Sequence, residues 1–214
     1  MDRATVVGWY GIKPGGLADL LSAVQQAVGT VVGHGFTPRP PTDLHATIIG
    51  LETGVEGAAP DLDGLVRYLA AELEREPLDV QFGGFADTDR RMRSGGETLY
   101  RRSLVLQGTA LVLVGWPMAP GPSARLGEIR RRCERYGFRH KYHRRPQDLD
   151  ADVYLVVGDI AEPARAAELV DRVRREVLAT AVRVALKAAD LSLVEYLDPR
   201  LPVATSRRRP LVTG

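Results

Sequence analysis

Apolar residues along the chain follow two different spacings, which predict helices and strands in succession. Between Leu17 and Val28 they recur every three or four positions, the spacing of one buried helix face. Shorter apolar runs at 5–12 and 44–51 predict strands before and after this helix. We expect Gly29 to end the helix, because glycine is common just past a helical segment.

The same two spacings continue through the rest of the chain. Further helices are predicted at 62–73, 123–136 and 163–178, and further strands at 78–85, 99–107, 110–116, 151–160, 182–186 and 191–196. Pro60 and Asp61 are typical residues for the start of the first of these helices. Gly108-Thr109 separates two strands by a turn that suits a hairpin and is too short for a parallel crossover.

The second half of the chain repeats the first in outline. Gly8-Trp9 and Gly115-Trp116 each close a strand, and a turn and a helix follow each of them. Asp43-Leu44 and Asp148-Leu149 then each precede another apolar strand. A repeated order of elements is typical of two similar structural units packed together.

These patterns predict an α+β fold in one bilobal domain over residues 1–214. Each of two pseudo-symmetric lobes, at about 1–98 and 99–204, is expected to hold a small antiparallel-rich sheet with two helices on its outer face. A cleft is expected between the lobes. Residues 205–214 are expected to form a basic tail.

Composition narrows the class of protein. Cys133 is the only cysteine, so one chain holds neither a disulfide framework nor a cysteine-based zinc site. No segment reaches the roughly 18 apolar residues of a membrane span. We therefore expect a cytoplasmic protein with no membrane association.

Charge is unevenly distributed, although the net charge is only +2. The segment 130–145 is rich in arginine and contains one acidic residue, Glu134. Such a run favours a phosphate-containing partner, such as a nucleotide or an RNA end, but it also suits a solvated helix face followed by a charged loop. The candidate phosphate-binding residues in its second half are Arg139, Lys141, His143 and Arg144.

Candidate chemistry lies in the strand predicted at 44–51. Alternation along a strand places His45 and Thr47 on the same face. An imidazole transfers protons near neutral pH, and a hydroxyl two residues away can hydrogen-bond a phosphate oxygen. A single His-x-Thr triplet also occurs by chance, so its meaning depends on the surrounding architecture.

In that architecture, the sequence LHATIIGLE at 44–52 resembles the first signature of the 2H (two-histidine) phosphoesterase superfamily. The superfamily includes bacterial RNA-ligase-like proteins and cyclic phosphodiesterases. The resemblance covers the architecture of nearly the whole chain. It implies two His-x-Thr/Ser motifs, one in each lobe, which meet across a cleft on 2′,3′-cyclic phosphates or 2′-5′ linkages.

The second motif departs from this pattern. The strand at 151–160, ADVYLVVGDI, has Asp152 and Tyr154 where the resemblance implies histidine and threonine. Loss of one member of an acid–base pair typically lowers the rate by about 10²- to 10⁴-fold. The candidate catalytic residues are therefore His45, Thr47, Asp152 and Tyr154, with His140 or His143 as alternative second proton carriers.

Three hypotheses remain open at this point. The protein is a phosphodiesterase that acts through one intact motif, a module of the same fold that binds a nucleotide or RNA phosphate without turnover, or a scaffold for protein contacts. No cofactor is expected. No metal is expected either, because His140 and His143 lack a neighbouring carboxylate cluster with ligand spacing.

Overall fold

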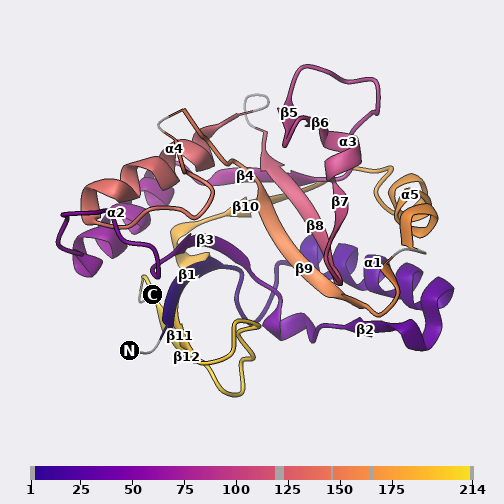
Figure 1. Ribbon diagram of the computed structural model, residues 1–214, viewed down its shortest axis with the longest axis horizontal. Helices are drawn as coiled ribbons and strands as arrows, with labels where there is room; N and C mark the ends of the chain where they lie inside the picture. The colour runs from indigo at the N-terminus through magenta and orange to yellow at the C-terminus, as the bar shows by residue number, and fades with distance from the viewer. Residues whose placement is uncertain (1–2, 119–122, 146, 164–165, 213–214) are drawn as a thin grey trace.

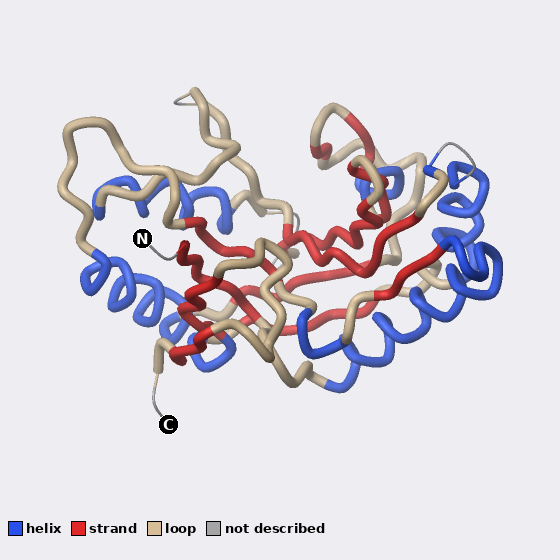
Figure 2. Tube along the Cα trace, turned by 60° about the horizontal axis from the view of Figure 1, so that its bottom comes forward, coloured by secondary structure: helices blue, strands red, loops and turns tan. Residues whose placement is uncertain are grey.

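The computed structural model describes residues 3–118, 123–145, 147–163 and 166–212. It has an α+β fold, in agreement with the sequence prediction, with antiparallel strands in the middle and helices towards both ends (Figures 1 and 2). The first main sheet consists, in spatial order, of β12 (Arg207–Pro210), β11 (Leu191–Tyr196), β1 (Arg3–Gly8) and β3 (Ala46–Gly50). Strand β3 is therefore an edge strand of this sheet.

The second main sheet is larger. Its spatial order is β10 (Val182–Leu186), β4 (Leu78–Phe82), β8 (Ala110–Pro117), β9 (Val153–Ile160) and β2 (Phe36–Pro38), and β7 (Leu104–Gln107) also pairs with β8. The predicted hairpin is confirmed, because β7 and β8 pair in antiparallel register on either side of Gly108-Thr109. A separate small hairpin joins β5 (Arg93–Ser94) to β6 (Glu97–Thr98).

Two helices pack together at one end of the molecule, on the right of Figure 1: α1 (Gly15–Val32) and α5 (Ala166–Glu176). The apolar stripe of α1 predicted from the sequence is buried, from Leu17 to Val28. The helix continues past Gly29 and ends at Gly33, so the predicted end was wrong. The reason is that Gly33, with φ 59°, adopts the positive φ that stops a helix.

The other two long helices, α2 (Leu62–Arg75) and α4 (Arg125–Arg132), lie beside each other on the left of Figure 1. Glu72 of α2 lies 3.7 Å from both Arg125 and Arg132 of α4. The predicted start of α2 is confirmed, because the Asp61 carboxylate accepts a hydrogen bond from the Gly64 amide at 2.8 Å. A 3-10 turn extends α4 to Tyr136, so helical backbone covers most of the predicted range 123–136.

Further predicted elements differ from the structure. The strand predicted at 5–12 ends at Gly8, and Ile12 is 93% exposed. The strand predicted at 99–107 begins as a short helix, α3 (Leu99–Arg102), because the Thr98 hydroxyl caps its amino end by accepting from the Arg101 amide. The tail 205–214 is not a free arm in its described part, because β12 pairs with β11. Residues 164–165 of the helix predicted at 163–178 and residues 213–214 of the tail lie outside the described residues.

The sheets do not follow the expected division of the chain into 1–98 and 99–204. The first sheet joins β1 and β3 to β11 and β12, and the second joins β2 and β4 to β8, β9 and β10. Each sheet therefore takes strands from both halves of the sequence. No helix within the described ranges is long and apolar enough to cross a membrane.

Candidate functional site

The His-x-Thr triplet lies at the start of the edge strand β3. Leu44, Ala46 and Ile48 are at most 1% exposed and belong to the main core, whereas His45 and Thr47 are half-buried on the opposite face. This alternation agrees with the predicted shared face of His45 and Thr47. The strand itself begins one residue after His45.

The imidazole of His45 is held in one tautomer. Its Nδ1 lies 2.7 Å from the backbone carbonyl oxygen of Asp43. A carbonyl oxygen only accepts hydrogen bonds, so Nδ1 carries the proton and Nε2 carries the lone pair. Burial lowers the pKa of His45. The hydrogen bond to Asp43 opposes this effect, and the nearby charges of Arg39 and Lys13 add to it. His45 is therefore a neutral imidazole with a basic Nε2 at neutral pH.

We name the cavity in front of His45 the histidine pocket. It has a volume of about 250 Å³. Its lining includes His45, Thr47, His140, Lys141 and Tyr196. The pocket thus joins two imidazoles, the hydroxyls of Thr47 and Tyr196 and an ammonium group, which are groups that bind phosphate and move protons, and it also contains the carboxylate of Glu52.

His140 is the second imidazole of the histidine pocket. It is 3% exposed, and its Nε2 lies 3.1 Å from a carboxylate oxygen of Asp150. Because that carboxylate accepts, Nε2 carries the proton of the neutral ring, and Nδ1 is buried without a hydrogen-bond partner among the described residues. Burial lowers the pKa of His140, and Asp150 opposes this effect. Asp150 orients His140 as a carboxylate orients an imidazole in many proton-transfer sites.

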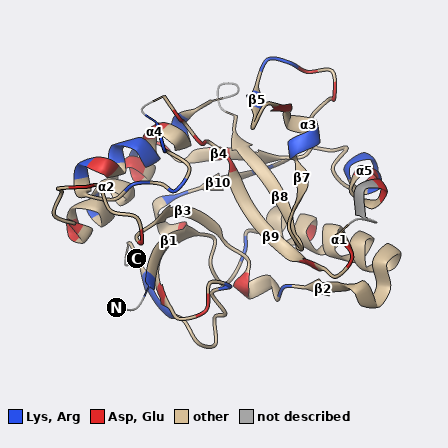
Figure 3. Ribbon diagram, viewed as in Figure 1, with Lys and Arg blue, Asp and Glu red and all other residues tan. Residues whose placement is uncertain are grey.

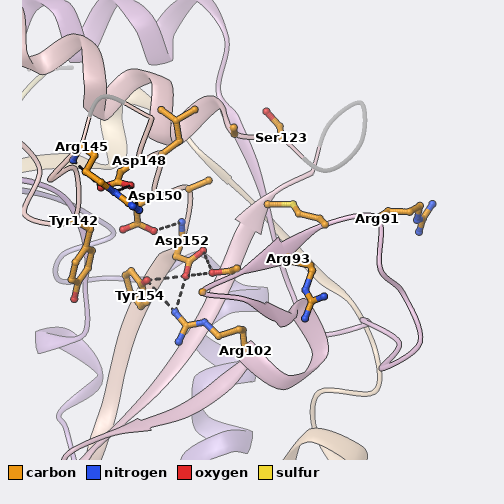
Figure 4. Close-up of a pocket in the computed structure, with 16 residues that line it drawn as sticks. Arg91, Arg93, Arg102, Ser123, Tyr142, Arg145, Asp148, Asp150, Asp152 and Tyr154 are labelled. Carbon is orange, nitrogen blue, oxygen red and sulfur yellow. Dashed lines mark hydrogen bonds and ion pairs between the residues drawn. The ribbon is translucent and has the colours of Figure 1, made fainter.

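Asp152 and Tyr154 face a different environment, shown in Figure 4. The Asp152 carboxylate accepts hydrogen bonds from Ser94 Oγ at 2.6 Å and Trp116 Nε1 at 2.6 Å. It also accepts from Tyr154 Oη at 2.8 Å and pairs with Arg102 Nη2 at 2.9 Å. Burial raises the pKa of Tyr154, so its hydroxyl remains protonated. The engaged oxygens of Asp152 favour a structural role, and its assignment as a catalytic residue stays a prediction.

Asp152 and Tyr154 line a second cavity, which we name the arginine pocket. Its volume is about 590 Å³, and its lining shares no residue with that of the histidine pocket. Tyr142 lines the arginine pocket, and its neighbour Lys141 lines the histidine pocket. The segment from His140 to Tyr142 therefore lies between the two cavities.

Arg130 connects the two strand segments that carry the polar pairs. Its guanidinium is fully buried and donates to the carbonyl oxygens of Thr47 at 2.7 Å and Ile48 at 2.9 Å. It also donates to the carbonyl oxygens of Asp150 at 2.8 Å and Asp152 at 3.0 Å. The backbones of the two segments are thus held together, although their side chains open into separate pockets.

The predicted phosphate-binding residues are dispersed. Lys141 lines the histidine pocket and lies over the ring of Tyr142, 4.7 Å from its centroid. Arg139 instead lies 3.5 Å from Glu134, and His143 is 1% exposed and accepts a hydrogen bond from the Asp150 amide. Arg144 is exposed and lines neither pocket. Burial lowers the pKa of His143 to about 4, so it is neutral at pH 7.

The sequence patterns did not predict that Arg102, Ser94 and Arg130 all contact Asp152. Arg102 lay in the strand predicted at 99–107, and Ser94 lay between two predicted strands. Neither belonged to a motif, and Arg130 was one of many arginines in its segment. Nothing in their local sequence marks them. Across the part of the chain that the structure describes, no group of three or more histidine, cysteine, aspartate or glutamate side chains is arranged to hold a metal ion.

Comparison with known proteins does not assign a family. No protein-family model matches the chain, and no curated protein matches it. Among solved structures, the chain is similar to the protein TT0787 of Thermus thermophilus, with 19% sequence identity and a TM-score of 0.49. The similarity covers 97% of this chain and 93% of that one.

Proposed function

We propose that the protein cleaves a phosphodiester in the histidine pocket, at a 2′,3′-cyclic phosphate, a 2′-5′ linkage or an RNA-end phosphate. The observation that carries this proposal is the hydrogen bond from His45 Nδ1 to the Asp43 carbonyl, which leaves Nε2 as a base beside the Thr47 hydroxyl. A base near neutral pH and a hydroxyl donor on one face are what the cleavage of a phosphodiester requires.

In the proposed reaction, His45 Nε2 removes the proton of the attacking hydroxyl group or water. The Thr47 hydroxyl donates a hydrogen bond to a non-bridging phosphate oxygen, and the Lys141 ammonium offsets the charge that develops there. The leaving oxygen needs a proton from a second group. His140 is the candidate, because it lines the same pocket. It would give up a proton from Nδ1 of its charged ring, a form that Asp150 favours and burial disfavours.

The proposal also includes the finer architecture expected from the sequence. The two main sheets would belong to two lobes related by an approximate two-fold axis, as in the 2H phosphoesterases that the segment 44–52 resembles. The proposal keeps the cytoplasmic location expected from the sequence.

A second candidate function is binding of a nucleotide or RNA phosphate without turnover. The hydrogen bonds that engage Asp152 favour it, because the residue in the place of a second catalytic histidine has no free oxygen for proton transfer. In this case His45, Thr47 and Lys141 would hold the phosphate.

Turnover of a panel of 2′,3′-cyclic nucleotides and 2′-5′ dinucleotides, compared between wild type and His45→Ala, tests the proposal. We expect His45→Ala to lower kcat by about 10²- to 10⁴-fold, because proton transfer acts in the transition state. The matched control is His34→Ala, which removes an exposed histidine outside both pockets and should leave kcat unchanged. Binding of the panel by wild type without turnover would support the second function, and equal turnover by wild type and His45→Ala would reject the first.

A further inference from the structure

The arginine pocket has a chemistry of its own that the proposed cleavage at His45 does not use. Four arginines line it, and they come from the loop before β5, from β5, from α3 and from the loop before β9 (Figure 4). They are Arg91, Arg93, Arg102 and Arg145. Figure 3 shows the blue of lysine and arginine on α3. Arginines that converge on a cavity from separate segments are typical of anion recognition.

The carboxylates of the pocket are already paired, two of them with Arg145 and Arg102 of the same pocket. Asp148 lies 2.9 Å from Arg145, and Asp150 pairs with His140 and with the buried Arg130. Asp152 is engaged by four donors, as described above. The negative charge of the lining is thus already compensated, and none of these three carboxylates pairs with Arg93 in the described chain.

Arg93 and Arg102 keep unused hydrogen-bond donors. The exposed Arg93 donates to the Gly96 carbonyl and has no carboxylate within ion-pair distance among the residues that the structure describes. Arg102 engages Asp152 and Tyr154 through Nη2 only, and its Nε is buried without a hydrogen-bond partner in the described ranges. The donors that these hydrogen bonds leave unused, such as Nη1 of Arg102, suit an anionic ligand.

The lining of the pocket also has exposed apolar surface. Tyr142 is 38% exposed and Leu149 is 48% exposed, and both line the pocket. The ring of Tyr142 lies edge-on to that of Tyr154, with the ring centroids 6.0 Å apart. In Figure 4, Tyr142 lies on one side of the cavity and Arg93 on the other. A cavity of about 590 Å³ is within the range that small-molecule ligands occupy, and it is much larger than inorganic phosphate needs.

We propose that the arginine pocket binds a phosphate monoester that carries a flat organic group. The doubly charged phosphate lies between Arg93 and Arg102, with the Ser94 hydroxyl nearby, and the flat group lies against Tyr142. This inference does not depend on cleavage at His45, because no residue lines both pockets.

Isothermal titration calorimetry on the full chain tests the proposal with three probes: phenyl phosphate, glycerol phosphate and inorganic phosphate. We expect phenyl phosphate to bind most tightly, since the other two probes have no ring for Tyr142. Arg93→Gln should weaken all three by about tenfold or more, as expected for loss of a charge-assisted hydrogen bond. Arg135→Gln is the matched control, because Arg135 is exposed, lines neither pocket and should leave the affinities unchanged.

Two further variants separate this inference from the proposed function. Tyr142→Ala should abolish the preference for phenyl phosphate over glycerol phosphate while binding of inorganic phosphate persists. His45→Ala should abolish turnover of the diester and leave affinity for phenyl phosphate within about twofold, since His45 lies in the other pocket. The inference is wrong if wild type binds none of the probes, or if Arg93→Gln and Arg135→Gln bind them equally.

Discussion

The two pockets differ in what their central polar groups are free to do. In the histidine pocket, Asp43 engages only one nitrogen of His45, and the other nitrogen keeps its lone pair. In the arginine pocket, four donors engage the carboxylate of Asp152. His45 is followed two positions later by Thr47, and Asp152 by Tyr154. Both hydroxyl-bearing residues lie at the start of a strand.

A polar pair at a strand start becomes reactive only through the partners that surround it. A single backbone contact orients His45 and leaves it able to accept a proton, whereas a complete set of donors stabilises Asp152 as a charged structural group.

Loss of the group that joins the two regions should have the largest effect on stability. Arg130→Met removes four hydrogen bonds to backbone carbonyl oxygens. Two of these oxygens belong to the edge strand β3, and two belong to the segment just before β9. We expect the free energy of unfolding to fall by about 3–5 kcal/mol. Urea denaturation measures this change. Arg135→Met, at an exposed position, is the control, and an equal effect of both substitutions would contradict the linking role of Arg130.

A smaller change in the free energy of unfolding should distinguish Asp152 from His45. Asp152→Asn keeps the shape of the side chain but removes the charge that Arg102 pairs with and turns an acceptor into a donor. We expect it to lower the free energy of unfolding by about 2–3 kcal/mol, and His45→Ala to lower it by less than about 1 kcal/mol. The control for the first substitution is Asp19→Asn on the exposed face of α1. Comparable losses for Asp152→Asn and His45→Ala would remove the distinction between the pockets.

Much of the fold could be predicted from the sequence because local patterns determine it. Helical spacing located the buried stripe of α1, Asp61 located the start of α2, and Gly108-Thr109 located a hairpin. The strand content of each sheet could not be predicted in this way. Pairing of β1 with β11, far along the chain, depends on tertiary packing and not on local spacing.

The local part of the candidate site could also be predicted from the sequence, whereas its contacts between distant residues could not. Alternation in the segment 44–51 correctly places His45 and Thr47 on one face, because a strand has a fixed period of two. The contacts of Asp152 with Ser94, Arg102 and Trp116 join residues 36 to 58 positions apart, so no short motif reports them. The burial of His143 likewise follows from the fold of its loop and not from its basic neighbours.

The protonation of His45 is the central claim, and an NMR titration that resolves its two ring nitrogens tests it most directly. The expected result at pH 7 is a neutral ring with the proton on Nδ1 and a bare Nε2, and a protonation midpoint below the ordinary 6.5. Because the folded-state pKa lies below the unfolded value, protonation of His45 should also destabilise the fold as the pH falls below about 6.5. A proton on Nε2 at pH 7, or a midpoint above 6.5, would contradict the assignment of His45 as the base of the histidine pocket.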